Sequence, residues 1–440
     1  MTRKEFDEIY VNYGERRYPA ETTQSVQACH FTYEKKEQAI TDAKELRRIS
    51  KKAAMEDVIH FFNCLKRCYC GYDYFLTDEL CEKIQKQLSL KIKLWPRKIS
   101  NRRLWYFLYQ ALHNKISDSH FELHVAGRSL FFRKNHIAYV ADIVLCKSND
   151  SYEVVNDNAD FEKGYVFEKN QVQEYLMPTL YLGADSRIDE SYYLLGKYSE
   201  TEVKEFLLAG KKVKTHRILC DLATQDGEER IVPKDGYVLV NHKSYGMPWE
   251  EALLAEYYKD GVSCAGSDAV ILNLTGNGGG CSDYPSNFYE GLNGSGENGF
   301  LGAHLPAPSE LCDEGKKYEF FYPDSEIPAT YQGDLYVVMN HAVASSAEMG
   351  VSPSFYVKNA VRVGSGSLGC ASFGECVTFQ LPNSKIIFCF GHKLFYHERF
   401  EECKGFLPDF WIDDKEPVRV VEEYIKRKKE TKYEHSTFNH

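Results

Sequence analysis

Short apolar strands alternate with helical segments in the part of the chain that begins near residue 235. The segments DGYVLVNH (235–242), SDAVILNL (267–274) and DLYVVMN (334–340) have the character of strands, and PWEEALLAEYYKDG (248–261) has that of a helix. Strands that alternate with helices usually lie parallel in one sheet, because a parallel connection needs a long crossover. The pattern therefore predicts an α/β fold, a largely parallel sheet with helices on its faces.

The whole chain is too long, at 440 residues, for one ordinary hydrophobic core. We expect a helical N-terminal region over 1–120, a small β-rich module over 121–232, and the α/β domain over 233–425. The last segment, 426–440, contains the basic run KRKK and is expected to be a disordered tail.

Local patterns give the elements of these regions. The helical pattern starts near residue 37 and includes a helix capped by Thr77 and another over 101–116. In the β-rich module, 197–213 has the pattern of one short helix followed by a glycine turn, and its predicted strands are 136–146, 152–157 and 216–223. Later, ECVTFQLPNSKIIFCFG (375–391) predicts a hairpin that turns at PNS.

Composition excludes several classes of function. The formal net charge of −10 disfavours nucleic acid and anionic membranes as partners, and no apolar run is long enough to span a bilayer. The charged first residues lack the apolar core of a secretory signal, and the 14 cysteines have no disulfide-framework spacing, so we expect a cytoplasmic protein with reduced thiols. The cluster of Cys64, Cys68 and Cys70 has no paired partner and fits a buried helix face, so we expect no metal there. No motif in the sequence implies a metal or an organic cofactor.

A glycine-rich turn, LTGNGGG, follows the predicted strand at 267–274. Its successive backbone N–H groups suit a phosphate or a developing oxyanion, although a plain tight turn has the same composition. Cys281 follows Gly280 where a phosphate-binding P-loop requires lysine, so that alternative is excluded.

Two adjacent serines, Ser345 and Ser346, stand where a strand gives way to a helix in VVMNHAVASSAEMG. A serine at this place is either a helix N-cap or a nucleophile near the positive end of the helix dipole. If Ser345 attacks, then the N–H of Ser346 can join Gly279 or Gly280 in binding an oxyanion.

The order of these motifs resembles the C-terminal processing peptidase family of serine proteases, which includes the tail-specific proteases and the tricorn core protease. VILNLTGNGGG, VVMNHAVASSAE and the later Gly405-Phe406-Leu407-Pro408-Asp409 are similar to family motifs over about 235–415, and ISDSHFELH (116–124) adds one more. The resemblance implies a crotonase-like (ββα-superhelix) catalytic domain, and it implies that 121–232 corresponds to a PDZ-like module.

The resemblance also implies roles for single residues. Ser345, three residues before Glu348, would be the nucleophile. Cys370 stands where many members carry the basic lysine, so a serine–lysine dyad is not expected unless Lys358 or Lys385 enters the site. The tricorn-like branch instead implies His120 as general base, with Ser119 and Glu402 assisting. Alternatives in this sequence are Ser346 or Cys370 as nucleophile, His341 as base, Glu401 in place of Glu402, and a capping role for His120.

The predicted function is therefore hydrolysis of peptide bonds in peptides or unfolded protein segments by a serine endopeptidase or carboxy-terminal processing peptidase. Two alternatives stay open. One is an inactive relative that binds peptides as a scaffold, and the other is a hydrolase of small esters or thioesters that uses the same oxyanion geometry. A homo-oligomer is compatible with the sequence.

Overall fold

The computed structural model describes residues 1–15, 20–31, 46–182, 192–225, 229–246, 250–304, 320–321 and 330–437. The chain is a mixed α/β protein, as the sequence predicts. It divides into two compact units, each described by itself below. The first unit comprises residues 1–134, 300–323 and 370–403, and the second comprises 135–299, 324–369 and 404–440.

The first unit combines helices with an antiparallel sheet. Its helices are α1 (Arg3–Glu15), α2 (Ala20–Cys29), α4 (Lys51–Cys68), α5 (Tyr72–Phe75), α6 (Asp78–Leu94) and α7 (Asn101–Leu112). Its strands are β1 (His30–Phe31), β2 (Arg48–Ile49), β3 (Ile99–Ser100), β4 (Asp118–Val125), β5 (Arg128–Phe132), β17 (Leu301–His304), β18 (Phe320–Phe321), β21 (Phe373–Gln380) and β22 (Ile387–Tyr396).

Side-chain caps start the long helices of this unit. Ser50, Thr77 and Ser100 each accept a hydrogen bond from a backbone N–H three residues later. The predicted cap at Thr77 is confirmed. The helical pattern that begins near residue 37 starts outside the described residues and continues as α4 from Lys51.

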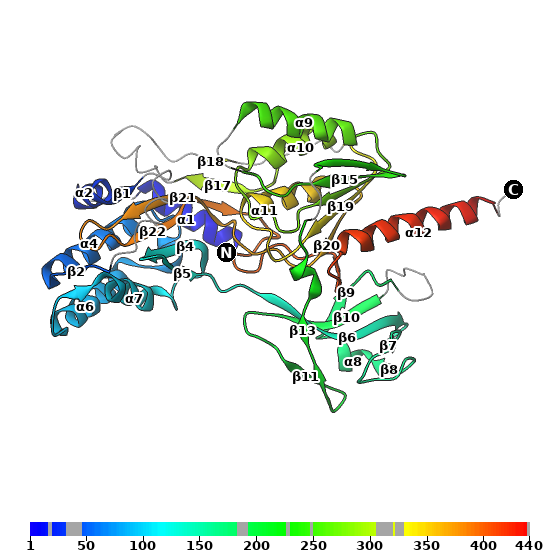
Figure 1. Ribbon diagram of the computed structural model, residues 1–440, viewed down its shortest axis with the longest axis horizontal. Helices are drawn as coiled ribbons and strands as arrows, with labels where there is room; N and C mark the ends of the chain where they lie inside the picture. Colours follow the sequence, from blue (N-terminus) through cyan, green and yellow to red (C-terminus); the bar gives the residue numbers. More distant parts are fainter. Residues whose placement is uncertain are drawn as a thin grey trace. The chain divides into compact units, whose positions relative to one another are not determined.

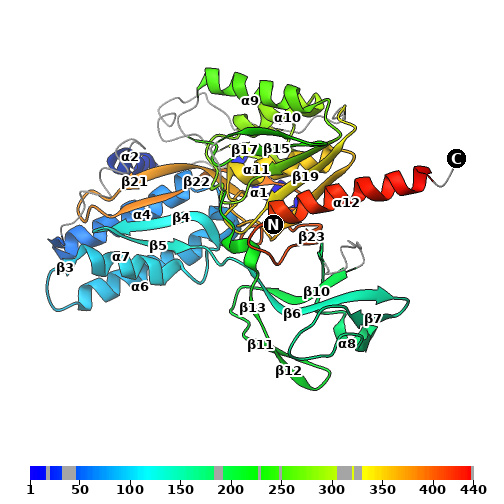
Figure 2. The same cartoon turned by 45° about the vertical axis from the view of Figure 1, so that its right-hand side comes forward.

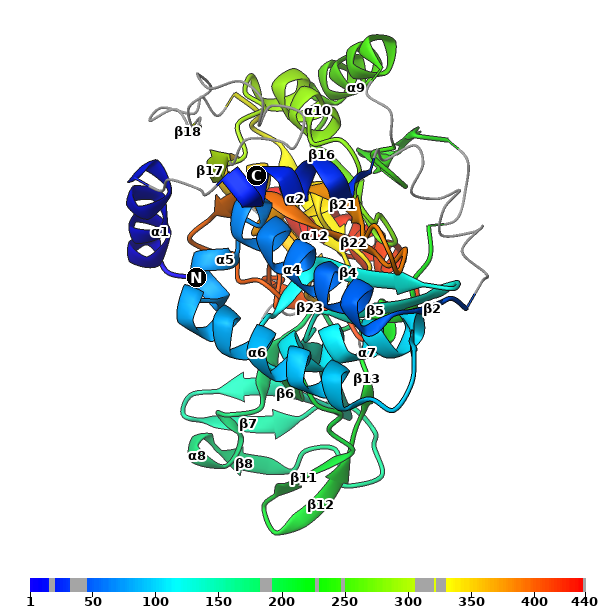
Figure 3. The ribbon, with the colours of Figure 1, turned by 90° about the vertical axis from the view of Figure 1, so that its left-hand side faces the viewer.

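The N-terminal helices do not form a domain of their own, which differs from the division expected at residue 120. β4 pairs with β22, with His124 opposite Ile387, so segments far apart in sequence share one sheet. Phe61 of α4 packs against Phe388 with ring centroids 5.0 Å apart, and Figure 3 shows α4, α6 and α7 beside β4 and β22. The predicted hairpin is confirmed as β21 and β22.

The second unit contains the predicted parallel sheet. Its helices are α8 (Lys169–Val172), η1 (Leu219–Leu222), α9 (Glu251–Cys264), α10 (Asp283–Asn293), α11 (Ser346–Val351), η2 (Ser352–Tyr356) and α12 (Pro417–Thr437). Its strands are β6 (Ile137–Ser148), β7 (Ser151–Val154), β8 (Val166–Glu168), β9 (Leu176–Pro178), β10 (Tyr192–Ser199), β11 (Glu205–Leu208), β12 (Lys211–Lys214), β13 (His216–Arg217), β14 (Ile231–Lys234), β15 (Tyr237–Asn241), β16 (Ala269–Asn273), β19 (Asp334–Met339), β20 (Ala360–Gly364) and β23 (Phe410–Trp411).

Strand order in the main sheet is β14-β15-β16-β19-β20-β23, and every pair from β15 onward is parallel. Each residue of β16 is buried, as expected for a central strand covered on both faces. Figure 1 shows α9 and α10 on one side of this sheet and α12 on the other. Because the strands are parallel, the segments that follow β16 and β19 meet at the carboxyl ends of the strands.

The β-rich part of this unit is a sheet in the order β8-β7-β6-β10-β9, with β13 also on β6 (Figure 2). The helix predicted within 197–213 is wrong, because Glu205–Leu208 and Lys211–Lys214 form a β-hairpin. Ala209 and Gly210 between them both have positive φ, which a two-residue hairpin loop requires.

Two other local expectations also fail. The strand predicted over 216–223 stops at Arg217, and Leu219–Leu222 form the 3₁₀ helix η1. The basic tail is not disordered at 426–429, since α12 continues through it and Lys428 pairs with Asp334 at 3.0 Å. Buried Val421 and Ile425 hold this helix against the sheet.

Candidate active site

Ser345 lies on the turn that joins β19 to α11, half-buried, with φ 55° and ψ −126°. Residues other than glycine rarely adopt positive φ, because Cβ crowds the backbone. Such strain persists only where surrounding contacts enforce it, and a serine on a sharp strand-to-helix turn is a recurring arrangement of hydrolase nucleophiles. The backbone of Ser345 therefore needs a specific restraint.

Glu348 provides that restraint. Its carboxylate is fully buried and accepts hydrogen bonds from the N–H of Ser345 at 3.1 Å, the hydroxyl of Ser367 at 2.6 Å and the N–H of Gly369 at 2.7 Å. The Ser367 hydroxyl oxygen in turn accepts the N–H of Phe406 at 2.8 Å. A buried carboxylate with three donors is well satisfied, so it fixes the turn that carries Ser345 to the segment after β20.

The glycine turn lies directly against Ser345. A Cβ built on Gly279 would be 2.7 Å from the carbonyl oxygen of Ala344 and 2.9 Å from the Cβ of Ser345, and Gly279 has φ +99°. Only glycine permits this approach. The N–H of Gly279 donates to Oδ1 of Asn277 at 2.9 Å, so it is occupied in this structure.

Ser346 and Gly280 also come together. The Ser346 hydroxyl donates to the carbonyl oxygen of Gly280 at 2.7 Å, which holds this side chain in a structural contact. Of the two adjacent serines, Ser346 is buried and Ser345 is the more exposed. The structure thus gathers Ser345, Ser346, Gly279 and Gly280 at one place. The N–H groups of Gly280 and Ser346 are the candidate oxyanion donors.

Ser119, His120 and Glu402 belong to the first unit. His120 lies within β4 and not at a helix end, because α7 stops at Leu112. The register between β4 and β5 shifts between Asp118 and Glu122, so His120 stands in a bulge, a feature that often redirects side chains near functional sites.

Glu402 is bound to this bulge. One of its carboxylate oxygens accepts the N–H of Ser119 at 3.0 Å, and the other accepts the N–H of Ser372 at 2.9 Å. The structure therefore brings the carboxylate of Glu402 next to the backbone of Ser119. Glu401, the alternative, is exposed.

Asp118 is a residue that the sequence reasoning missed. It is fully buried, and its carboxylate accepts the N–H groups of His120 at 2.7 Å and Phe121 at 3.2 Å and the hydroxyl of Tyr69 at 2.9 Å. Burial raises the pKa of the Asp118 carboxyl from 3.8 to about 7, although these hydrogen bonds act in the opposite direction. An acidic residue two positions before a candidate base was the available signal.

Replacing Asp118 with asparagine should flatten the pH dependence of stability. Because folding raises this pKa, the contribution of Asp118 to the free energy of unfolding is complete below about pH 4. It is lost as the pH rises through about 7, at about 1.4 kcal/mol per pH unit. Asparagine imitates the protonated form, so Asp118→Asn should gain in melting temperature over wild type between about pH 5 and about pH 8. A difference that stays constant with pH, as expected for the exposed Asp150→Asn, would contradict the assignment.

The predicted nucleophile and base lie in different units: Ser345 in the second and His120 in the first. Their pairing stays a prediction. Among the alternatives, His341 follows β19, and its backbone N–H donates to Asp221 at 3.2 Å. Lys358 precedes β20 and so lies at the amino ends of the parallel strands, whereas Ser345 lies at their carboxyl ends. Cys370 and Lys385 are in the first unit.

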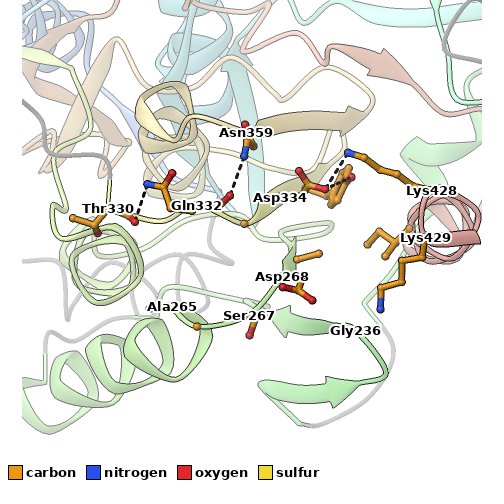
Figure 4. A pocket seen from close by; sticks show the side chains of 15 residues that line it. Gly236, Ala265, Ser267, Asp268, Thr330, Gln332, Asp334, Asn359, Lys428 and Lys429 are labelled. Carbon is orange, nitrogen blue, oxygen red and sulfur yellow. Dashed lines mark hydrogen bonds and ion pairs between the residues drawn. The ribbon is translucent and has the colours of Figure 1, made fainter. Parts of the chain in front are cut away.

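A cavity of about 750 Å³ opens at that opposite edge, where the parallel strands begin. Asp268, Asp334 and Asn359 line it from the sheet, and Lys428 and Lys429 line it from α12 (Figure 4). The Lys428–Asp334 ion pair closes one side. Because Ser345 follows the carboxyl end of β19, this cavity is not the site of the proposed chemistry.

In the segments that the structure describes, no three His, Cys, Asp or Glu side chains are grouped to hold a metal ion. Likewise, none of the helices there combines the length and apolar character that crossing a lipid bilayer requires.

Comparison with solved structures gives matches of low sequence identity. No family model matches the sequence, and no curated protein matches it. Mature CPAF is 13% identical over 86% of this chain and 95% of its own, with a TM-score of 0.44. The photosystem II D1 C-terminal processing protease is 10% identical over 83% of this chain and 96% of its own, with a TM-score of 0.40. The tricorn protease is 12% identical over 82% of this chain and 34% of its own, with a TM-score of 0.37.

Proposed function

We propose that the chain is a serine peptidase that hydrolyses peptide bonds in peptides or unfolded protein segments. The observation that carries the proposal is Ser345, held at positive φ on a strand-to-helix turn against the glycine turn. A strained serine beside backbone N–H groups that can bind an oxyanion is the arrangement that acyl transfer needs. The resemblance of the sequence motifs to C-terminal processing peptidases favours the same reaction.

In the proposed mechanism, Oγ of Ser345 attacks the carbonyl carbon of the scissile peptide while His120 accepts the hydroxyl proton. The N–H groups of Ser346 and Gly280 stabilise the oxyanion, and Gly279 joins them if it releases Asn277. His120 then returns the proton to the leaving amine, and water hydrolyses the acyl-enzyme.

The remaining predicted roles complete the proposal. Glu402, through its bond to the N–H of Ser119, fixes the segment that carries His120. We assign the catalytic domain to the crotonase-like superhelix, and the β6–β10 sheet to a PDZ-like module that binds extended substrate at its edge. A cytoplasmic location belongs to the same proposal, because the 14 cysteines have no disulfide-framework spacing in the sequence.

An inactive, peptide-binding relative is the second candidate, because Cys370 replaces the lysine that many family members use. A fluorophosphonate probe separates the two. Wild type should form an adduct that peptide mapping places on Ser345, and Ser345→Ala should form none. If wild type is not labelled, or if an adduct persists in Ser345→Ala, the result would contradict the proposed serine peptidase activity. Labelling together with hydrolysis of small esters, but of no peptide in a broad library, would favour an esterase.

A further inference from the structure

Asn340, the residue directly after β19, is fully buried and uses its whole hydrogen-bonding capacity. Its Oδ1 accepts the N–H of Gly276 at 3.1 Å and the N–H of Ala342 at 3.2 Å. Its Nδ2 donates to the carbonyl oxygens of Cys220 at 3.2 Å and Ala223 at 3.1 Å. A side-chain amide has two donors and a two-fold acceptor, so all four positions are filled.

These four bonds join three segments that are distant in sequence. Gly276 begins the glycine turn, Ala342 belongs to the loop that carries Ser345, and Cys220 and Ala223 belong to η1 and the residue after it. One buried amide therefore fixes the relative positions of the glycine turn, of η1 and of the loop 340–345, which is called the nucleophile loop below.

Other contacts restrain the same loop on both sides of Ala342. The N–H of His341 donates to Asp221 at 3.2 Å, and that carboxylate, also bonded to the Ser365 hydroxyl, is anchored by Arg217 at 3.0 Å. The N–H of Ala344 donates to the carbonyl oxygen of Asn277 at 3.1 Å. The loop is thus fixed to η1 at its start and to the glycine turn at its end.

We infer that Asn340 is a positioning residue, which sets the distance between Ser345 and the oxyanion donors through the nucleophile loop and the glycine turn. The inference rests on the proposed role of Ser345. Asn340 does not touch the reacting atoms, and it acts by holding the two segments in register. A displacement of about 1 Å at such a place is enough to lower a rate by about 100-fold.

Asn340→Asp gives the sharpest test, because it changes two donors and almost no volume. The retained oxygen still accepts from Gly276 and Ala342, but the second oxygen faces the carbonyls of Cys220 and Ala223. An ionised carboxylate is repelled there, whereas a protonated carboxyl donates one hydrogen bond. The defect should therefore grow as the pH rises.

The measured quantity is the rate constant for fluorophosphonate labelling of Ser345. The wild-type to Asn340→Asp ratio should rise from a few-fold near about pH 6 to about 100-fold near about pH 9. Because both proteins have the same base, the ratio of their rate constants cancels the pH dependence that comes from the titration of that base. The exposed Asn359→Asp is the matched control, and its ratio should stay near one. A flat ratio for Asn340→Asp would overturn the inference.

Amide hydrogen exchange tests the same contacts without relying on the reaction. In wild type the amides of Gly276 and Ala342 should exchange slowly. In Asn340→Asp both should exchange faster at high pH, where repulsion by the carbonyls of Cys220 and Ala223 displaces the ionised side chain and with it the oxygen that accepts from these amides. Fast exchange of these amides in wild type would overturn the inference. If wild type does not label at all, the proposed function fails, while slow exchange still supports the clamp that Asn340 forms.

Discussion

Replacing His120 with alanine is expected to lower kcat for peptide hydrolysis by about 10⁴-fold, and Ser345→Ala should cost at least as much. The physical reason is that a serine hydroxyl attacks a peptide only when its proton is taken up in the transition state. Without the base, the oxyanion donors and substrate binding still supply some acceleration, so the loss is large but limited.

The double variant decides whether the two residues act together. If His120 takes the proton of Ser345, then the double variant His120→Ala with Ser345→Ala should be no slower than Ser345→Ala alone. Once the nucleophile is lost, there is no proton for His120 to accept, so its removal has no further effect. Independent contributions would instead multiply. Ser345 and His120 lie in different units of the chain, so this kinetic coupling is the direct test of their pairing.

His341→Ala is the matched control for the base. Its backbone N–H, which donates to Asp221, survives the substitution, so the nucleophile loop keeps that bond. The variant should retain kcat within about threefold. If His341→Ala were the inactive variant and His120→Ala the active one, the base would be His341.

Local sequence predicted the parallel sheet because its strands are continuous apolar runs with buried side chains, such as Ala269–Asn273. It failed at 197–213, where helix-forming residues surround Ala209 and Gly210. There, buried Phe206, Leu208 and Val213 and exposed Leu207 follow a period of two instead. Tertiary burial overrode helix propensity at this hairpin.

The candidate site was predictable where its residues are neighbours in sequence. Ser345 and Glu348 are three apart, and the glycine turn is contiguous. Asn340 and Asp118 were missed because their roles depend on distant partners: Asn340 bonds to residues 64 and 120 positions away, and Asp118 bonds to Tyr69. The available signal for Asn340 in the sequence was an asparagine directly after an apolar predicted strand and close to the suspected nucleophile.

The second large effect is expected from Glu348→Gln. Both carboxylate oxygens of Glu348 accept bonds, so an amide nitrogen must face either the N–H of Ser345 or the donors from Ser367 and Gly369. A buried backbone N–H left without a partner costs about 1–3 kcal/mol. The free energy of unfolding should fall by about this amount, measured by urea denaturation.

Glu348→Gln should also slow the labelling of Ser345 more than this loss of stability explains. Ser345 keeps φ 55° only while its surroundings enforce that angle, and the bond from its N–H to Glu348 is the direct restraint. Labelling under conditions where the variant is fully folded should therefore fall by about 100-fold. Glu290→Gln, an exposed change on α10, should alter neither quantity. A folded Glu348→Gln that labels at the wild-type rate would mean that other contacts hold the nucleophile turn.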